Sequence, residues 1–534
     1  MRSTGLLPAP ISRHVLATPR PDFPAERLEG RQFIQHARSP PQSSRPSRKE
    51  YTALIHSTAT DRNAGNRDSS PPERKLASRI ADLIVRDISS DGWAAGRVIG
   101  SEAELLQRYD VSRAVFRESV RLLEHLGVCT TRRGPGGGLV VTAPSTAGVV
   151  QAFLVYLTYA DLSLPELLEA RVSLERSVAR LAAERADEQQ ISAMRERVVA
   201  DRGRAALDAA AHHVLHTMIG AAAANPAAEL FVDVLGRLTA RWSYPVVSVA
   251  KQNEALDASA AAHEAIVDAI TAGNTALAER RMNAHLGALA DWLGRNRQTP
   301  ISLDRVLDDG EPDAKLGSQV ARAIIVDIAD RGWPMGDVLG SEAELIATYQ
   351  VSRSALREAV RLLEYHEVAT MRRGPGGGLV VTAPSIEPIV RAATVFLEHR
   401  GITAADLIAM RRDLESDAVA LATERATTAQ IADLRLTLES NADADFEGPL
   451  GEELHVRIAE LSGNAAMALF VRVLVELTRL HASIPGRRSG RRSAINAETD
   501  HAHRAIVEAI ARRDPALAQR RVTKHLNAIE PLLR

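Results

Sequence analysis

The stretch that decides the fold is residues 101–142, SEAELLQRYDVSRAVFRESVRLLEHLGVCTTRRGPGGGLVVT. It opens on Ser101-Glu102-Ala103-Glu104, a capping box in which a serine and a glutamate three residues later cap the same helix N-terminus. A second capping serine, Ser112, precedes a longer amphipathic segment. Two short β-rich runs, 128–131 and 139–142, then flank a glycine-rich turn. Two helices joined by a short turn and followed by a β-hairpin predict a winged helix-turn-helix.

The same stretch occurs a second time in the chain. Residues 341–382 read SEAELIATYQVSRSALREAVRLLEYHEVATMRRGPGGGLVVT, and aligning 93–145 with 333–385 without gaps gives 36 identities in 53 positions. The offset of 240 residues also relates His263 to His503 far downstream, so the repeated unit extends beyond this motif. We therefore interpret the chain as a tandem duplication of one unit.

The second helix of each motif presents arginines on one face. Arg113 and Arg117 are four residues apart, so both project from the same side of their helix. Such a helix can place its N-terminal residues in the major groove, where arginine binds guanine edges or phosphates. The alternative is a solvated face whose arginines pair with nearby glutamates, but the repeated motif and the wing favour DNA binding. The predicted DNA-binding residues of these helices are Ser112, Arg113, Arg117, Ser352, Arg353 and Arg357.

Each wing combines two arginines with a glycine-rich turn. The glycines allow backbone N–H groups to approach a phosphate closely, and the arginines supply positive charge. The GPGGG run lacks the Lys-Ser/Thr pair of a P-loop, which argues against a nucleotide site. The predicted wing contacts are Arg132, Arg133, Gly136, Arg372, Arg373 and Gly376.

Composition indicates a helical, globular protein. The chain has 534 residues, of which 45% are hydrophobic and only 4% aromatic. Its formal net charge of -1 means that any DNA site must be a local basic patch. No apolar run approaches the roughly eighteen residues of a membrane span, and Cys129 is the only cysteine. These features predict a cytoplasmic protein with no membrane association.

The repeat also sets the expected domain boundaries. Residues 1–72 are rich in proline, serine and arginine and predict a disordered leader. Residues 298–314, QTPISLDRVLDDGEPDA, have the composition of a linker. The predicted fold class is mainly α, with winged helix-turn-helix heads carrying small β wings at 73–142 and 315–382 and all-α domains at 146–297 and 386–534.

Residues 101–124 and 132–138 resemble the GntR family of bacterial transcriptional regulators. Downstream, Leu168–Glu175 (LEARVSLE) and His263–Ile270 (HEAIVDAI) resemble the FCD class of GntR effector domains. This second resemblance implies that the two all-α domains are helical-bundle effector domains, here called sensors. The resemblance implies a double-stranded DNA operator, a small organic-acid effector and, by family default, repression; it implies no catalytic residues and no enzyme activity. Because such proteins usually dimerise, one duplicated chain is expected to form an internal pseudo-dimer, with or without a further homodimer.

Histidines mark a candidate metal site in the first sensor. His212 and His216 are four residues apart and share a helix face, and His263 and His285 lie on two later helices. Together they offer four ligands inside a helical bundle. The FCD resemblance implies a divalent metal at these positions, with Asp or Asn in place of His212. A fourth imidazole favours Zn or Ni.

The second sensor retains three of these histidines, namely His455, His503 and His525. At the position four residues before His455 it has Gly451, with Glu452 as the nearest oxygen ligand. We therefore expect the second metal site to be weaker or lost.

Arg171 and Arg411 occupy equal places in the first helix of the two FCD-like segments. Each is a candidate effector-binding residue, because arginine binds a carboxylate through two parallel hydrogen bonds. A salt bridge to the glutamate four residues later, Glu175 or Glu415, is an equally good interpretation.

Two other functions compete with regulation. The first is a metal-dependent hydrolase that uses the histidines, but the sequence shows no acidic general base at a motif-like position beside them. The second is a metal- or metabolite-binding protein whose heads no longer bind DNA. Retention of the arginine pairs in both heads argues against that alternative.

Overall fold

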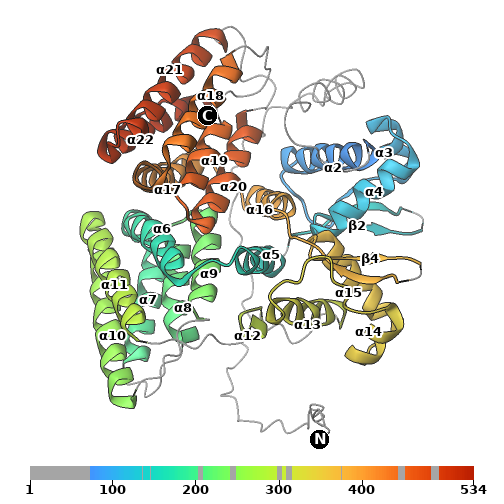
Figure 1. Ribbon diagram of the computed structural model, residues 1–534, viewed down its shortest axis with the longest axis horizontal. Helices are drawn as coiled ribbons and strands as arrows, with labels where there is room; N and C mark the ends of the chain where they lie inside the picture. The colour runs from blue at the N-terminus through green and yellow to red at the C-terminus, as the bar shows by residue number, and fades with distance from the viewer. Residues whose placement is uncertain are drawn as a thin grey trace, which may run out of the picture.

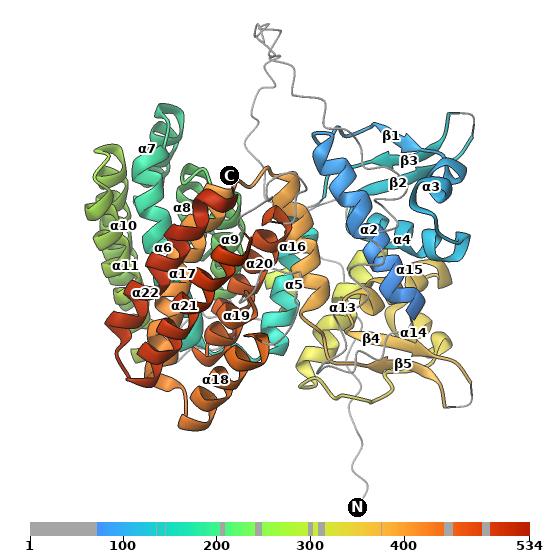
Figure 2. The same ribbon diagram turned by 90° about the horizontal axis from the view of Figure 1, so that it is seen from above.

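The computed structural model describes residues 72–134, 136–144, 146–202, 209–240, 248–296, 303–307, 316–374, 376–442, 452–482 and 492–533. Apart from Pro72, the predicted leader lies outside these residues. The described chain forms two heads and two helical sensors, and both heads lie on the same side of the sensor pair (Figures 1 and 2). None of the described helices combines the length and apolar character that a membrane crossing requires.

The first head contains the two helices and the β-hairpin that the sequence predicts, preceded by a further helix and a short strand. It consists of α2 (Pro72–Ser90), β1 (Val98–Gly100), α3 (Glu102–Tyr109), α4 (Arg113–His125), β2 (Cys129–Arg132) and β3 (Gly138–Val141). The capping box forms, since the Ser101 hydroxyl accepts from the Glu104 N–H at 3.3 Å and the Glu104 carboxylate accepts from the Ser101 N–H at 2.8 Å. The three strands form an antiparallel sheet in the order β1-β3-β2. Strand β1 was not predicted, because three residues are too short to show an alternating pattern.

The second head repeats this arrangement with α13 (Leu316–Asp330), α14 (Glu342–Tyr349), α15 (Arg353–Tyr365), β4 (Ala369–Arg372) and β5 (Gly378–Val381). In both heads a buried or half-buried tyrosine ties the middle helix to the first one. Tyr109 donates to Asp87 at 2.7 Å, and Tyr349 donates to Asp327 at 2.5 Å. In place of β1, Val338 forms a single bridge with Val380.

Each sensor is a bundle of seven described helices, all on one side of the heads (Figure 2). In the first sensor, Ser163 and Glu166 form a capping box at the start of the helix that begins at Leu164. Thr403 and Asp406 form the equivalent cap in the second sensor. The first sensor contains α5 (Thr146–Tyr159), α6 (Leu164–Arg185), α7 (Glu188–Asp201), α8 (Ala209–Ala222), α9 (Pro226–Ala240), α10 (Val249–Thr271) and α11 (Thr275–Arg295). The second contains α16 (Glu387–His399), α17 (Ala404–Arg425), α18 (Thr428–Ala442), α19 (Glu452–Leu461), α20 (Ala465–Ala482), α21 (Arg492–Ala511) and α22 (Pro515–Leu533).

The two sensors pack against each other around a pseudo-twofold axis. Phe231 of α9 stacks on Phe470 of α20 with ring centroids 4.1 Å apart. Asn225 donates to the Asp406 carbonyl at 3.0 Å, and Asn464 donates to the Glu166 carbonyl at 2.8 Å, so the same contact forms in both directions. Among the described residues, five ion pairs also cross this interface at 2.5–3.0 Å, namely Arg176–Asp417, Arg180–Asp413, Arg185–Asp406, Arg400–Glu229 and Arg425–Glu169.

Each head packs on the first sensor helix of the other copy. The Trp93 ring of the first head lies 5.2 Å from His399 at the end of α16, and Trp333 of the second head lies 5.2 Å from Tyr159 at the end of α5. Helix α2 accordingly runs beside α16, and α13 beside α5 (Figure 1). A short helix, α12 (Leu303–Leu307), interrupts the predicted linker and packs between α5, α9 and α13. The two copies are thus interlocked.

Candidate nucleic-acid interface and metal centres

The N-termini of α4 and α15 present the predicted DNA-binding residues to solvent. Ser112 caps α4 by accepting from the Val115 N–H at 3.3 Å, and Ser352 caps α15 in the same way. Residues 112–114 and 117 are exposed, as are 352–354 and 357, while the following apolar residues are buried. The capped end of each helix therefore offers its capping serine and two arginines on an accessible face.

The arginines of this face form only exposed ion pairs. Arg117 lies 3.4 Å from Glu102, and Arg353 and Arg357 lie 3.3 and 3.2 Å from Glu342. The side chains of Arg117 and Arg357 remain 65% and 63% exposed. Exposed pairs of this kind contribute about 0–1 kcal/mol, so a phosphate or guanine can displace the glutamate at little cost.

The glutamates of α4 have two different uses. Glu118 pairs with Arg121 at 3.0 Å, as the solvated-face alternative predicted for this part of the helix. Glu124 instead accepts from the backbone N–H and the hydroxyl of Thr131 at 2.9 and 2.8 Å. Because Thr131 belongs to β2, Glu124 fixes the wing relative to the recognition helix.

Both wings have the glycine turn that the sequence predicts. Gly136 and Gly376 have φ of 70° and 71°, the left-handed region that favours glycine. A Cβ on Gly137 would lie 2.3 Å from the Arg132 carbonyl oxygen, so this position also requires glycine. Arg132 donates to the Gly136 carbonyl at 2.9 Å, which holds the turn, and all four wing arginines are exposed: Arg132, Arg133, Arg372 and Arg373. Both wings project away from the sensors (Figure 2).

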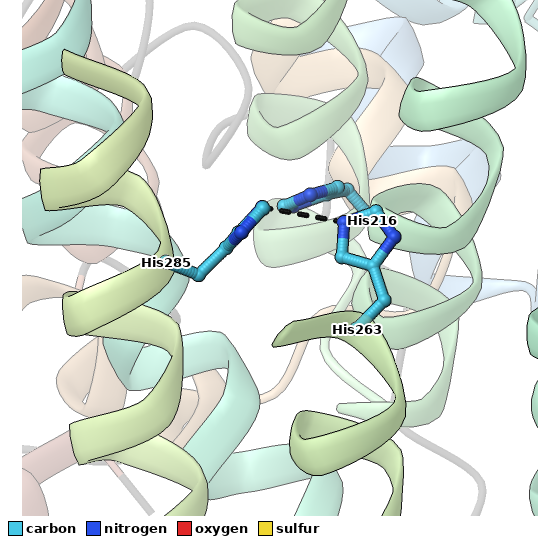
Figure 3. Close-up of side chains that lie close together, drawn as sticks. All are labelled: His216, His263 and His285. Atoms are coloured by element: carbon cyan, nitrogen blue, oxygen red, sulfur yellow. Dashed lines mark hydrogen bonds between the residues drawn. The ribbon is translucent and has the colours of Figure 1, made fainter. Parts of the chain in front are cut away.

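The core of the first sensor brings three of the four predicted histidines together. His216 on α8, His263 on α10 and His285 on α11 point toward one another (Figure 3), and one ring nitrogen of each lies within 4.8 Å of the others. The Nε2 atoms of His263 and His285 are 3.2 Å apart. All three rings are buried. The side chain of His212, the fourth predicted ligand, lies outside the described part of the chain.

The second sensor contains an equivalent cluster. The Nε2 atom of His503 lies 3.2 Å from Nε2 of His455 and 3.1 Å from Nε2 of His525. The three residues come from α19, α21 and α22 and are buried. Within the described residues, each cluster therefore brings together three buried histidines from three helices. Gly451 and the Glu452 side chain, which decide the fourth position of the second cluster, are not among the described groups.

A buried glutamate orients one histidine of each cluster. Glu175 contacts Nδ1 of His216, and Glu415 lies 2.5 Å from Nδ1 of His455. A carboxylate only accepts, so Nδ1 donates and Nε2 keeps its lone pair toward the other rings. The sequence interpretation found no acid beside the histidines and missed this role. The signal was present, because Glu175 and Glu415 are themselves 240 residues apart.

Arg171 and Arg411 complete this buried layer. Arg171 donates through Nε to Glu175 at 2.5 Å, and Arg411 donates to Glu415 at the same distance. The salt bridge, one of the two interpretations of these arginines, is therefore formed in both sensors. Within the described residues, Nη1 and Nη2 of Arg411 are buried and have no hydrogen-bond partner.

The electrostatics of the clusters disfavour the charged form of His263, His285, His503 and His525 and favour the charged form of the two glutamates. Burial, with the neighbouring histidine and arginine, lowers the pKa of His285 and of His525 to about 3. Burial also lowers the pKa of His263 and His503 well below the usual value. For Glu415, burial alone would raise the pKa, but Arg411 and His455 lower it to about 2. A neutral imidazole is the form that binds a metal.

The arrangement of nitrogens fits a divalent cation. Two nitrogens that are each about 2.0–2.1 Å from a tetrahedral Zn ion are about 3.3–3.4 Å apart, close to the Nε2 separations in both clusters. Neutral imidazoles held by a carboxylate at the remote nitrogen are a common ligand set for Zn and Ni. The residues that would hold the ion are the three histidines of each sensor, and a bound ion would supply a positive charge for an anionic ligand.

Comparison with known proteins agrees with this architecture. Residues 76–139 and 316–379 match the bacterial regulatory proteins of the gntR family, and residues 166–288 and 406–528 match the FCD domain. The HTH-type transcriptional repressor NanR of Salmonella newport is 32% identical over 224 residues, covering 40% of this chain and 84% of the repressor. NanR of Salmonella arizonae is also 32% identical, with 83% of its length covered.

Among solved structures, Streptococcus agalactiae GntR matches with 25% identity and a TM-score of 0.31, covering 40% of this chain and 99% of its own. The matched domains and the NanR relatives belong to transcription regulators, which decides against the hydrolase interpretation. Two gntR-type heads and two FCD domains in one polypeptide also account for the 240-residue repeat. The chain belongs to the gntR family of bacterial regulatory proteins, in its FCD class, as a tandem duplication of the whole unit.

Proposed function

We propose that this chain is a repressor that reads two DNA half-sites with its two heads and is controlled by a small carboxylate bound near a metal ion in its sensors. The observation that carries the DNA part is the duplicated, capped helix N-terminus with exposed arginines beside an arginine-bearing wing. Repression is proposed because the NanR relatives are repressors. A protein that binds an operator acts beside the chromosome, so a cytoplasmic location is part of this proposal.

The interlocked arrangement of the copies supports the proposal that one chain uses both heads on one operator. The stacked rings of Phe231 and Phe470 and five ion pairs join the sensors within one chain. Each head also rests on a sensor helix of the other copy. One chain thereby supplies the paired heads that a symmetric dimer supplies in other regulators.

The carboxylate effector is supported by the buried arginines. Arg411 uses Nε for Glu415 and has two buried NH2 groups, Nη1 and Nη2, without a partner in the described chain. Unpaired buried donors are costly, and an anionic ligand would satisfy them. Arg171 occupies the same position in the first sensor, where its Nη2 lies 3.4 Å from Nδ1 of His216.

Coupling between sensor and head is proposed to run through α5 and α16. Helix α5 packs on α9 of its own sensor and on α13 of the second head, and α16 packs on α20 and α2. A ligand that shifts these helices would change the placement of the two heads. Effector and operator would then favour different arrangements of the same molecule.

The test is DNA binding of the full chain with and without metal. The chain is incubated with labelled DNA from upstream of its own gene, first with a chelator, then with Zn or Ni, and then with a panel of small carboxylates. We expect a footprint of two half-sites whose affinity changes with metal and one carboxylate. A footprint whose affinity changes with neither metal nor any carboxylate would contradict the metal and effector parts of the proposal. The absence of any footprint would contradict the DNA part.

A matched pair of variants separates a metal effect from a general one. His216→Ala removes a buried cluster histidine, whereas His501→Ala removes an exposed histidine on α21. We expect metal dependence of binding to weaken in the first and to persist in the second. Equal behaviour of the two variants would contradict a role for the cluster.

A further inference from the structure

The exposed tips of the two recognition helices are identical except at one position. Ser112, Arg113 and Arg117 correspond to Ser352, Arg353 and Arg357, but Ala114 corresponds to Ser354. Both Ala114 and Ser354 are exposed, and each lies next to the arginine pair on the accessible side of its helix. The difference therefore falls on the surface that is proposed to meet the base edges.

The two tips consequently offer different chemistry. In the first head the position carries only a methyl group. In the second head the Ser354 hydroxyl lies 2.9 Å from the hydroxyl of the capping Ser352, which itself accepts from the Ala355 N–H. An alanine methyl favours contact with the thymine methyl group, whereas a serine hydroxyl donates to or accepts from a base edge.

Two other differences between the heads fall on surfaces of another kind. Arg108 and Thr348 differ near the C-terminal ends of α3 and α14, the helices that cross the DNA backbone in this motif. Thr131 and Met371 differ in the wing, but the Thr131 hydroxyl is bonded to Glu124 and so faces the helix. Such positions affect affinity for DNA in general, whereas Ala114 and Ser354 lie at the helix tips.

We propose that Ala114 and Ser354 make the two heads read half-sites that differ at one base pair, so that the operator is asymmetric and the chain binds it in one orientation. This rests on the proposed function, because it assumes that both helix tips enter the major groove. A symmetric homodimer cannot make this distinction, since its two heads are identical by construction. A duplicated chain can, because its two heads mutate independently.

The test is selection of operators from a library randomised in both half-sites, using the full chain. Two variants exchange the distinguishing residue: Ala114→Ser gives both tips the second head's residue, and Ser354→Ala gives both the first head's. The matched control is Ala432→Ser, an exposed alanine on α18 far along the chain from either head. Selected operators and their symmetrised versions are then compared by direct binding.

We expect wild type and the control to select an asymmetric operator and to bind it roughly 5- to 150-fold more tightly than either symmetrised version, the range for one mismatched base pair. Each exchange variant should instead prefer one symmetrised operator, and the two should prefer different ones. Selection of the same palindrome by wild type and both variants would overturn this inference and leave the proposed function standing. Failure to select any sequence would overturn both.

Discussion

Glu175 and Glu415 each join a buried arginine to a histidine ring of the candidate metal site. Such a carboxylate fixes which ring nitrogen is free for a ligand and how the ring is turned. The same glutamate neutralises an arginine that is almost completely buried. One residue therefore serves both the stability of the sensor and the chemistry of its site.

Glu175→Gln tests this role in the first sensor. The amide keeps the size of the side chain but removes the charge that holds His216 and Arg171, so we expect metal affinity to fall about 10- to 100-fold. Metal affinity is measured by competition with a chromogenic chelator. Both proteins also carry His455→Ala, so that only the affinity of the first site is measured. Glu188→Gln, an exposed change on α7, is the control. Unchanged affinity in Glu175→Gln would contradict the assignment.

The depressed histidine pKa values predict how the metal-free protein responds to pH. His285 and His525 have a pKa of about 3 in the folded chain, because burial and nearby positive groups disfavour their charged form. In the unfolded chain the value is about 6.5, so below that pH the unfolded state binds more protons. The free energy of unfolding should therefore fall as the pH drops from about 6.5, by up to ~1.4 kcal/mol per pH unit for each such histidine.

This pH dependence is measured by urea denaturation in the presence of a chelator at pH 7.5 and pH 5.5. The double variant His285→Gln, His525→Gln should show a smaller loss of stability between the two conditions. Equal losses in the variant and wild type would mean that these histidines are not responsible.

Among the elements, α4 and α15 carry the proposed base contacts. Their beginnings are exposed while Val115, Phe116, Ala355 and Leu356 anchor them in the head. Arg113→Ala should cost roughly 1–3 kcal/mol of operator binding and relax preference in one half-site only. Arg121→Ala, which removes an exposed arginine two turns further along, is the control. Equal weakening of Arg113→Ala on operator and random DNA would identify Arg113 as a phosphate contact instead.

The sequence predicted those elements whose signals are local. Ser101 with Glu104, and Ser112 before Arg113, mark helix starts by their own hydrogen bonds, and the structure contains both caps. The glycine turn of the wing is equally local. Strand β1 was missed because it depends on pairing with β3, and α12 was missed because three apolar residues in a linker gain their burial only from distant helices.

The candidate metal site was predicted in part. His216, His263 and His285 lie together, as predicted. The prediction was possible because these residues match the family pattern and, in part, recur 240 residues later. The place of Glu175 was not predicted, since its pairing with His216 depends on how α6 packs against α8. The packing of Trp93 on the other copy's α16 was equally hidden, because no local pattern records which copy a head contacts.

The whole molecule depends on the interface between its two sensors. Phe231 is completely buried and stacks on Phe470, so Phe231→Ala should lower the free energy of unfolding by about 3–5 kcal/mol and loosen the two sensors from each other. Urea denaturation gives the first quantity, and limited proteolysis between the copies reports the second. Phe116→Ala, a buried change within one head, is the comparison. If both variants lost stability but neither became more sensitive to proteolysis between the copies, the interface would not depend on Phe231.

The central claim is that one chain supplies both heads for one operator. Analytical ultracentrifugation of the purified chain with a single duplex operator, over a range of protein concentrations below and above saturation, gives the mass of the complex directly. We predict one chain per duplex with both half-sites protected from cleavage. A complex that contains two chains on one operator, with no stable one-chain complex at lower concentration, would contradict the claim.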